Sequence, residues 1–152
     1  MFDIKIDDLT GDQILALLEE HLADMQETSP PESKHALDLE GLKSSAVKFW
    51  TIWDGETLAG CGAYQKLDDT HAEIKSMRTA AGYKNKGVAS QLLTHLIENA
   101  KLSGYQRLSL ETGSMDYFKP ARALYAKHGF TYCAPFADYV EDPNSQFMSL
   151  KL

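Results

Sequence analysis

The middle of the chain has the residue types of an anion-binding site. No acidic residue occurs between Ile74 and Ile97, whereas four side chains there are cationic, namely Lys75, Arg78, Lys84 and Lys86. The chain as a whole has a formal net charge of −7. The pattern over 73–93 predicts a strand, a turn and a helix, and the N–H groups of a first helical turn lack intrahelical partners. We therefore expect the turn to bind an anion, and our hypothesis is the pyrophosphate of a cofactor.

Two small residues at the start of the predicted helix favour the same chemistry. Gly87 has no Cβ and Ala89 has a minimal one, so phosphate oxygens can approach the backbone amides there. An ordinary tight turn into a helix is the competing interpretation. It leaves the basic cluster unexplained.

Length and composition exclude several classes of protein. At 152 residues the chain fits one domain, 1–152. No apolar run approaches the ~18 residues of a membrane span, and the first residues do not resemble a secretory signal, so we expect a cytoplasmic protein with no membrane partner. Cys61 and Cys133 stand alone without ligands at zinc spacing, so no metal is expected. A pI near 5.1 argues against nucleic acid as the main partner.

The acidity is concentrated in residues 1–32. This part holds one lysine, Lys5, and nine carboxylates: Asp3, Asp7, Asp8, Asp12, Glu19, Glu20, Asp24, Glu27 and Glu32. A solvated helix face explains them most simply. Attraction of a cationic substrate is the alternative.

The first half of the chain predicts a strand, two helices and a three-stranded meander. Alternation over 2–7 favours a half-buried strand, and an apolar stripe over 14–25 favours a helix that Pro30 and Pro31 end. A short helix is expected over 35–43. Strands are expected over 47–53, 58–67 and 71–79, with Asp54-Gly55 as a two-residue hairpin turn. Gly60 and Gly62 predict a bulge or the close approach of another backbone.

The second half predicts alternating helices and strands. The helix that begins after Lys86 should bury Val88, Leu92, Leu93, Leu96, Ile97 and Ala100, and end near Gly104. A strand over 107–112, a helix over 120–128 and two strands over 130–135 and 146–152 follow. The order βααβββαβαββ predicts an α+β fold, with a mixed, mostly antiparallel sheet of about seven strands and helices on both faces.

Two motifs and this element order resemble the GNAT superfamily of acetyl-CoA-dependent acyltransferases. Lys84-x-x-Gly87-x-Ala89 is similar to the family's Arg/Gln-x-x-Gly-x-Gly/Ala pyrophosphate loop. Residues 123–130, Ala-Leu-Tyr-x-Lys-x-Gly-Phe, look like the end of the family's late helix. Parts of the chain also look like a bacterial branch named for indole-acetic-acid acetyltransferase.

The resemblance implies that acetyl-CoA is the co-substrate. Met77, Arg78 and Thr79 would hydrogen-bond the pantetheine arm as an added strand does, provided that strand 107–112 splays away. The pyrophosphate would lie on Lys84, Asn85, Lys86, Gly87, Val88, Ala89 and Ser90. Lys84 stands where the family has Arg or Gln and would act as a point charge, and Asn85 tolerates the left-handed backbone for which Gly is common. Phe118 stands where many relatives carry Asn.

Direct transfer of an acetyl group to an amine needs an oxyanion donor, an acid and a base. A backbone N–H near Met77 to Thr79 is the expected oxyanion donor. Tyr125 is the candidate acid, because a phenol is protonated at neutral pH; a purely structural core aromatic is the alternative. Glu73 is the first candidate base, although an ion pair with Lys75 explains it equally well. Glu111 and His71 are reserves.

The acceptor site is the least determined. Ser33 and His35, in the segment between the first two helices, are candidate acceptor contacts, and Ser33 could instead cap a helix. Residues 135–148 would form the opposite wall. We expect a primary amine of a small molecule or peptide as acceptor. An O-acetyl or longer-acyl transferase and a non-catalytic acyl-CoA-binding module are the alternatives. Dimers are common in the family, and a homodimer is left open.

Overall fold

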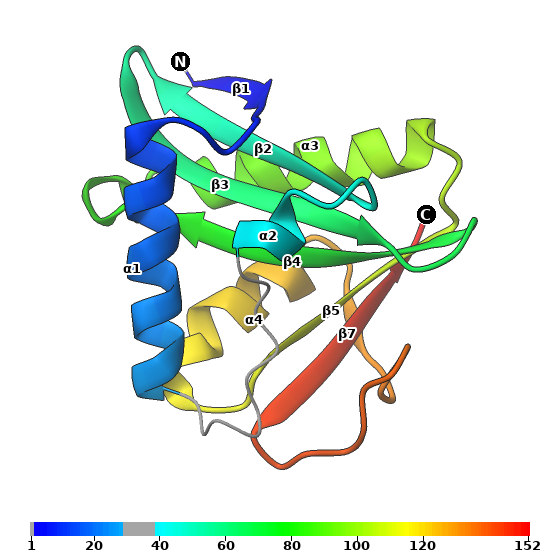
Figure 1. The fold of residues 1–152 in the computed structure, drawn as a ribbon. Coiled ribbons are helices and arrows are strands. Elements are labelled where there is room, and N and C mark those ends of the chain that lie inside the picture. The colour runs from blue at the N-terminus through cyan, green and yellow to red at the C-terminus, as the bar shows by residue number, and fades with distance from the viewer. Residues whose placement is uncertain (1, 29–38) are drawn as a thin grey trace.

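The computed structural model describes residues 2–28 and 39–152, and places seven strands of this part in one sheet (Figure 1). The strands are β1 (Asp3–Ile6), β2 (Val47–Asp54), β3 (Thr57–Lys66), β4 (His71–Thr79), β5 (Arg107–Gly113), β6 (Thr131–Tyr132) and β7 (Ser145–Lys151). The α-helices are α1 (Asp12–Thr28), α2 (Leu39–Leu42), α3 (Val88–Leu102) and α4 (Lys119–Lys127), with 3-10 turns η2 (Ala81–Tyr83) and η3 (Asp116–Phe118). The predicted fold class and element order are confirmed.

The sheet has the order β1-β2-β3-β4-β5-β7-β6. Neighbours are antiparallel except β4 and β5, which run parallel. The last strand, β7, inserts between β5 and the short edge strand β6. The predicted meander over β2, β3 and β4 is confirmed.

Helices cover both faces of the sheet. Figure 1 shows α1 and α2 in front of it and α3 and α4 behind. Each face has its own core, in which Leu17, Leu18 and Leu42 pack on the α1 side and α3 packs on the other. The α3 stripe is buried as predicted at Val88, Leu92, Leu93, Leu96 and Ala100, whereas Ile97 is only partly buried at the margin of the core.

The two glycines of β3 lie where atoms of β4 approach closely. A Cβ on Gly60 would lie 2.8 Å from the Arg78 carbonyl oxygen, and a Cβ on Gly62 would lie 2.5 Å from the Met77 sulfur. The β3–β4 register shifts between Cys61 and Ala63, so that two β4 residues stand opposite Gly62. Both predicted features, a bulge and a close backbone, are confirmed.

Some local predictions need correction. The hairpin loop consists of Gly55 and Glu56, because Asp54 still pairs with Thr57 and Gly55 takes the positive φ of 59° at the first loop position. Ile6 is 68% exposed, since only four residues of the edge strand pair with β2 and no helix covers its end. The second helix spans four described residues and ends one residue before Lys43, and the predicted residues 35–38 lie outside the described residues. In the described part of the chain, no helix is long and apolar enough to cross a membrane.

We predict that Gly60→Ala destabilises the protein by about 1–3 kcal/mol, because its Cβ would press on a β4 carbonyl oxygen that cannot move away. Gly82→Ala is the matched control, since its Cβ would meet nothing within 4 Å, and its effect should stay within about 0.5 kcal/mol. Urea unfolding of both variants measures the difference. Equal midpoints would contradict the close approach of the strands.

Candidate active site

A cleft opens where β4 and β5 part. The two strands pair only through His71–Arg107, Ala72–Leu108 and Glu73–Ser109 within the described chain. Beyond these pairs lies a cavity of about 110 Å³, lined by His21, Met25, Glu73, Ile74, Lys75, Ser76, Met77, Leu110, Glu111, Thr112, Gly113, Phe118, Ala121 and Tyr125. The splaying of strand 107–112, on which the expected pantetheine contact depends, is therefore present.

The bulge in β4 lies on the wall of this cleft. Lys75 pairs with Ala63 and Arg78 with Cys61, so Ser76 and Met77 together face Gly62. Ser76 has the left-handed φ of 57°. Met77 packs with the α3 core, whereas Arg78 contacts α1. On its other edge, β4 from Met77 to Thr79 has no neighbouring strand among the described residues, which leaves main-chain groups for a ligand.

The turn before α3 has the conformation that the sequence predicts. Asn85 adopts φ 62° and Gly87, the N-cap residue, adopts φ 81°. The first bond of the helix runs from the Gln91 N–H to the Gly87 carbonyl oxygen, so the N–H groups of the first turn have no helical partner. A Cβ on Gly87 would meet no atom within 4 Å, so a phosphate has room over these amides.

The cationic side chains of this segment do not all gather at the turn. Lys75 pairs with Glu73, at 3.1 Å. Arg78 pairs with Glu20 and Asp24 of α1, and although burial opposes its charge, these two hydrogen bonds raise its pKa. Lys86 lies over the Tyr83 ring, 5.4 Å from the centroid. The positive charge available to a ligand at the turn therefore comes from two lysines, 84 and 86, rather than from four cations.

The Glu73 carboxylate accepts hydrogen bonds from two neighbouring side chains. It is 3% exposed, and its Oε2 accepts hydrogen bonds from the Tyr139 hydroxyl at 2.5 Å and from Lys75 Nζ at 3.1 Å. Lys75 Nζ also donates to the Tyr139 oxygen at 2.9 Å. The ion pair that the sequence left as an alternative for Glu73 is present, and a tyrosine 66 residues away joins it.

Glu111 lies on β5, on the opposite wall from β4. Burial raises the pKa of Glu111 to about 7, although the neighbouring Ser145 hydroxyl and the Lys75 cation lower it; the Glu73 and Asp142 carboxylates also raise it. A carboxyl with this pKa gains and loses its proton near neutral pH, as a general base must.

Tyr125 lies on α4 at the cleft wall and is 7% exposed. Its ring packs edge-to-face on Phe130 with centroids 5.7 Å apart. Within the described chain its hydroxyl makes no hydrogen bond to protein atoms, and burial raises its pKa, so the phenol stays protonated at neutral pH. Both the acid role and the structural role predicted for this residue fit its position.

The remaining candidates are placed differently. His71 forms a 2.6 Å hydrogen bond with the Ser109 hydroxyl and does not line the cleft. Ser90, in the first turn of α3, lies 3.2 Å from His128 Nε2, which fixes its hydroxyl. Phe118 packs against Gly113 at the cleft wall. Ser33 and His35 lie outside the described residues.

The sequence reasoning missed His21, the contact of Tyr139 with Glu73, and the Arg78 ion pairs. His21 lies between Leu18 and Leu22 on the apolar stripe of α1, so its helical spacing could have identified a histidine facing inward. Tyr139 and the partners of Arg78 had no such signal, because those contacts join segments far apart in sequence.

A sheet that parts between two parallel strands, beside an exposed helix N-terminus, defines an acyltransferase of the GNAT type. The chain belongs to the acetyltransferase (GNAT) family, whose model matches residues 14–130. It is similar to the uncharacterized N-acetyltransferase YsnE of Bacillus subtilis, with 61% identity over 98% of this chain and 99% of that one. It is also similar to the IAA acetyltransferase of Azospirillum brasilense, with 33% identity over 92% and 89% of the two chains. The resemblance found in the sequence is confirmed.

Solved structures have the same fold. A solved structure from Klebsiella pneumoniae has a TM-score of 0.84 at 29% identity, and the match covers 100% of this chain and 98% of that chain. A GNAT family acetyltransferase from Elizabethkingia anophelis, solved with acetyl-CoA bound, has a TM-score of 0.71 at 19% identity, over 99% and 98% of the two chains. Within the described residues, no group of three or more histidine, cysteine or acidic side chains is arranged to hold a metal.

Proposed function

We propose that this protein transfers the acetyl group of acetyl-CoA to a primary amine of a small molecule or peptide. The observation that carries the proposal is the parting of β4 and β5 next to the first turn of α3, which offers a free strand edge and free helical amides to one extended ligand. The Elizabethkingia anophelis acetyltransferase binds acetyl-CoA on this fold, which supports the same co-substrate here.

The proposed binding residues form two groups, one for the pantetheine arm and one for the pyrophosphate. Main-chain groups of Met77, Arg78 and Thr79 would bind the pantetheine arm. The first-turn amides of α3 would bind the pyrophosphate, and Lys84 and Lys86 would add charge attraction that salt screens, because both are exposed. The side chain of Arg78 takes no part, since Glu20 and Asp24 hold it on the α1 side.

Glu111 is the better-placed base, and Glu73 is the alternative. The base removes a proton from the acceptor ammonium, and the nitrogen then bonds to the thioester carbonyl carbon to give a tetrahedral intermediate with an oxyanion; its collapse restores the carbonyl group and breaks the carbon–sulfur bond. Glu73 Oε2 already accepts two protein hydrogen bonds. Glu111 has a pKa of about 7, and it faces β4 across the cleft. The nitrogen loses a second proton as the amide forms.

Tyr125 is the proposed acid. The departing thiolate would take the proton of the Tyr125 hydroxyl, which no protein group of the described chain binds. The phenolate would then recover the second proton of the nitrogen, so that one proton in total reaches solvent. A backbone N–H at the β4 bulge, near Met77, would stabilise the carbonyl oxygen.

The direct test combines calorimetry with acetyl-CoA and a thiol-release assay with a panel of primary amines. We expect micromolar binding with one site per chain, and thiol release with at least one amine. Binding without release from any amine or peptide would indicate an acyl-CoA-binding module. Binding of ATP or NAD in place of acetyl-CoA would overturn the proposed function.

We predict that Tyr125→Phe lowers kcat by roughly 10²-fold or more, the usual contribution of a general acid, and leaves the Kd for acetyl-CoA nearly unchanged. Tyr132→Phe is the matched control, because Tyr132 is 60% exposed on the edge strand and should change neither constant. Steady-state kinetics and calorimetry of both variants provide the measurement. If kcat of Tyr125→Phe were unchanged, Tyr125 would not be the acid, and its role would be to pack against Phe130.

We predict that kcat/KM of the wild type rises with pH through about 7, because Glu111 acts only after it loses its proton, and burial holds the pKa of Glu111 there in the free protein. Glu111→Gln should lower kcat and abolish this rise, whereas Glu73→Gln should keep it. A pH–rate profile from about pH 5 to 9 distinguishes the two carboxylates. The reverse outcome, with the rise lost only in Glu73→Gln, would assign the base to Glu73.

A further inference from the structure

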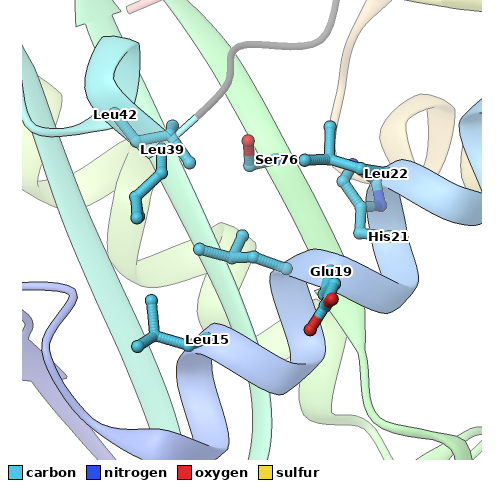
Figure 2. Close-up of a pocket in the computed structure, with 8 residues that line it drawn as sticks. Leu15, Glu19, His21, Leu22, Leu39, Leu42 and Ser76 are labelled. Atoms are coloured by element: carbon cyan, nitrogen blue, oxygen red, sulfur yellow. The ribbon is translucent and has the colours of Figure 1, made fainter.

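A second cavity lies between α1, α2 and β4, on the opposite side of β4 from α3. Its volume is about 250 Å³. The wall consists mainly of leucines, as Figure 2 shows for α1 and α2, and three residues give it polar atoms at its edge: Glu19, His21 and Ser76. Apolar cavities of about 150 Å³ already accept molecules as large as benzene.

This cavity adjoins the cleft that the proposed reaction uses. His21 and Ser76 line both spaces. Ser76 lies at the bulge of β4, next to the strand edge proposed for the pantetheine arm. A molecule in the cavity therefore reaches the cleft at the point where the thioester would lie.

His21 provides a polar group at this junction. Its Nδ1 is buried and makes no hydrogen bond to protein in the described chain. Burial lowers the pKa of His21 to about 4, and the nearby Arg78 cation also lowers it while Asp24 opposes this, so the ring is neutral near pH 7. A buried nitrogen without a partner costs free energy that a bound ligand can recover by hydrogen bonding.

We propose that the cavity is the acceptor subsite for a hydrocarbon or aromatic group, with the attached amine directed past His21 into the cleft. This inference rests on the proposed function and specifies its acceptor as a primary amine with an apolar substituent. Glu19, exposed at the edge of the cavity, adds a negative charge that favours a cationic acceptor over an anionic one. Among the described residues, the lining is mainly leucine, which favours an apolar substituent over a sugar or a peptide carboxylate.

A homologous series of linear alkylamines tests the subsite. With saturating acetyl-CoA, kcat/KM should rise about fourfold per methylene from ethylamine to hexylamine, since each buried CH₂ contributes about 0.8 kcal/mol and 1.4 kcal/mol is tenfold. Ether-containing amines of the same lengths should show a much smaller rise. An alkylamine series that is turned over with no dependence on length would overturn the subsite and leave the proposed function intact.

Two variants locate the effect in this cavity. Leu22→Phe should flatten the length dependence, because the larger ring occupies the space of the acceptor's substituent. Leu102→Phe is the control: Leu102 is 87% exposed, and the wild-type slope should persist. His21→Leu should raise KM for hexylamine about tenfold while the Kd for acetyl-CoA stays near its wild-type value. A Leu22→Phe slope equal to that of the wild type, in a variant with an unchanged melting temperature, would place the substituent elsewhere.

Failure of the proposed function would give a different result in the thiol-release assay. In that case no amine of either series releases thiol, although the protein binds acetyl-CoA, and the acceptor subsite is overturned with it. If thiol release is highest with the shortest or the ether-containing amines, only the apolar subsite is wrong.

Discussion

The separation of β4 from β5 is the constraint on which the site depends. After three paired positions the strands diverge, and β5 keeps its pairing with β7 instead. The divergence leaves one edge of β4 for a ligand and places Glu111 and Tyr125 at the walls of the resulting cleft. The bulge at Ser76 accompanies it, so that Arg78 turns to α1 while Met77 packs toward α3. One departure from regular pairing thus provides the strand edge proposed for the cofactor, the positions of the proposed acid and base, and contacts on both faces of the sheet.

The charges of the chain are divided between the two ends of the site. Arg78 on β4 forms ion pairs with two carboxylates of the acidic helix α1. These pairs neutralise part of the N-terminal negative charge, and they leave one cation fewer in the basic segment for a ligand. Lys75 is bound to Glu73 and Tyr139, at the inner end of the cleft. The lysines at the turn, which we propose for the phosphates, stay exposed. The N-terminal acidity is therefore partly structural, and Glu19 is exposed beside the cavity proposed for the acceptor.

Local patterns predicted the fold and the conformation of the turn before α3, because both depend on neighbouring residues. Helical and alternating periodicity defined the elements, and Asn85 and Gly87 carry the left-handed backbone that a turn of this kind needs. The acceptor end could not be predicted in the same way. The contact of Arg78 with Glu20 spans 58 residues, and that of Glu73 with Tyr139 spans 66. Nothing in a single sequence states which acid meets which base across a sheet.

Cofactor binding and the choice of acceptor would depend on different kinds of groups. The groups proposed for acetyl-CoA are backbone amides and a strand edge, which persist as long as the turn and the parted strands persist. The cavity beside them is formed by side chains of α1, α2 and β4, such as Leu22 and Leu42, which can change size without altering either the sheet or the turn. His21 couples the two spaces because it lines both. Relatives with the same cofactor end can therefore differ in acceptor through a few residues on α1 and α2.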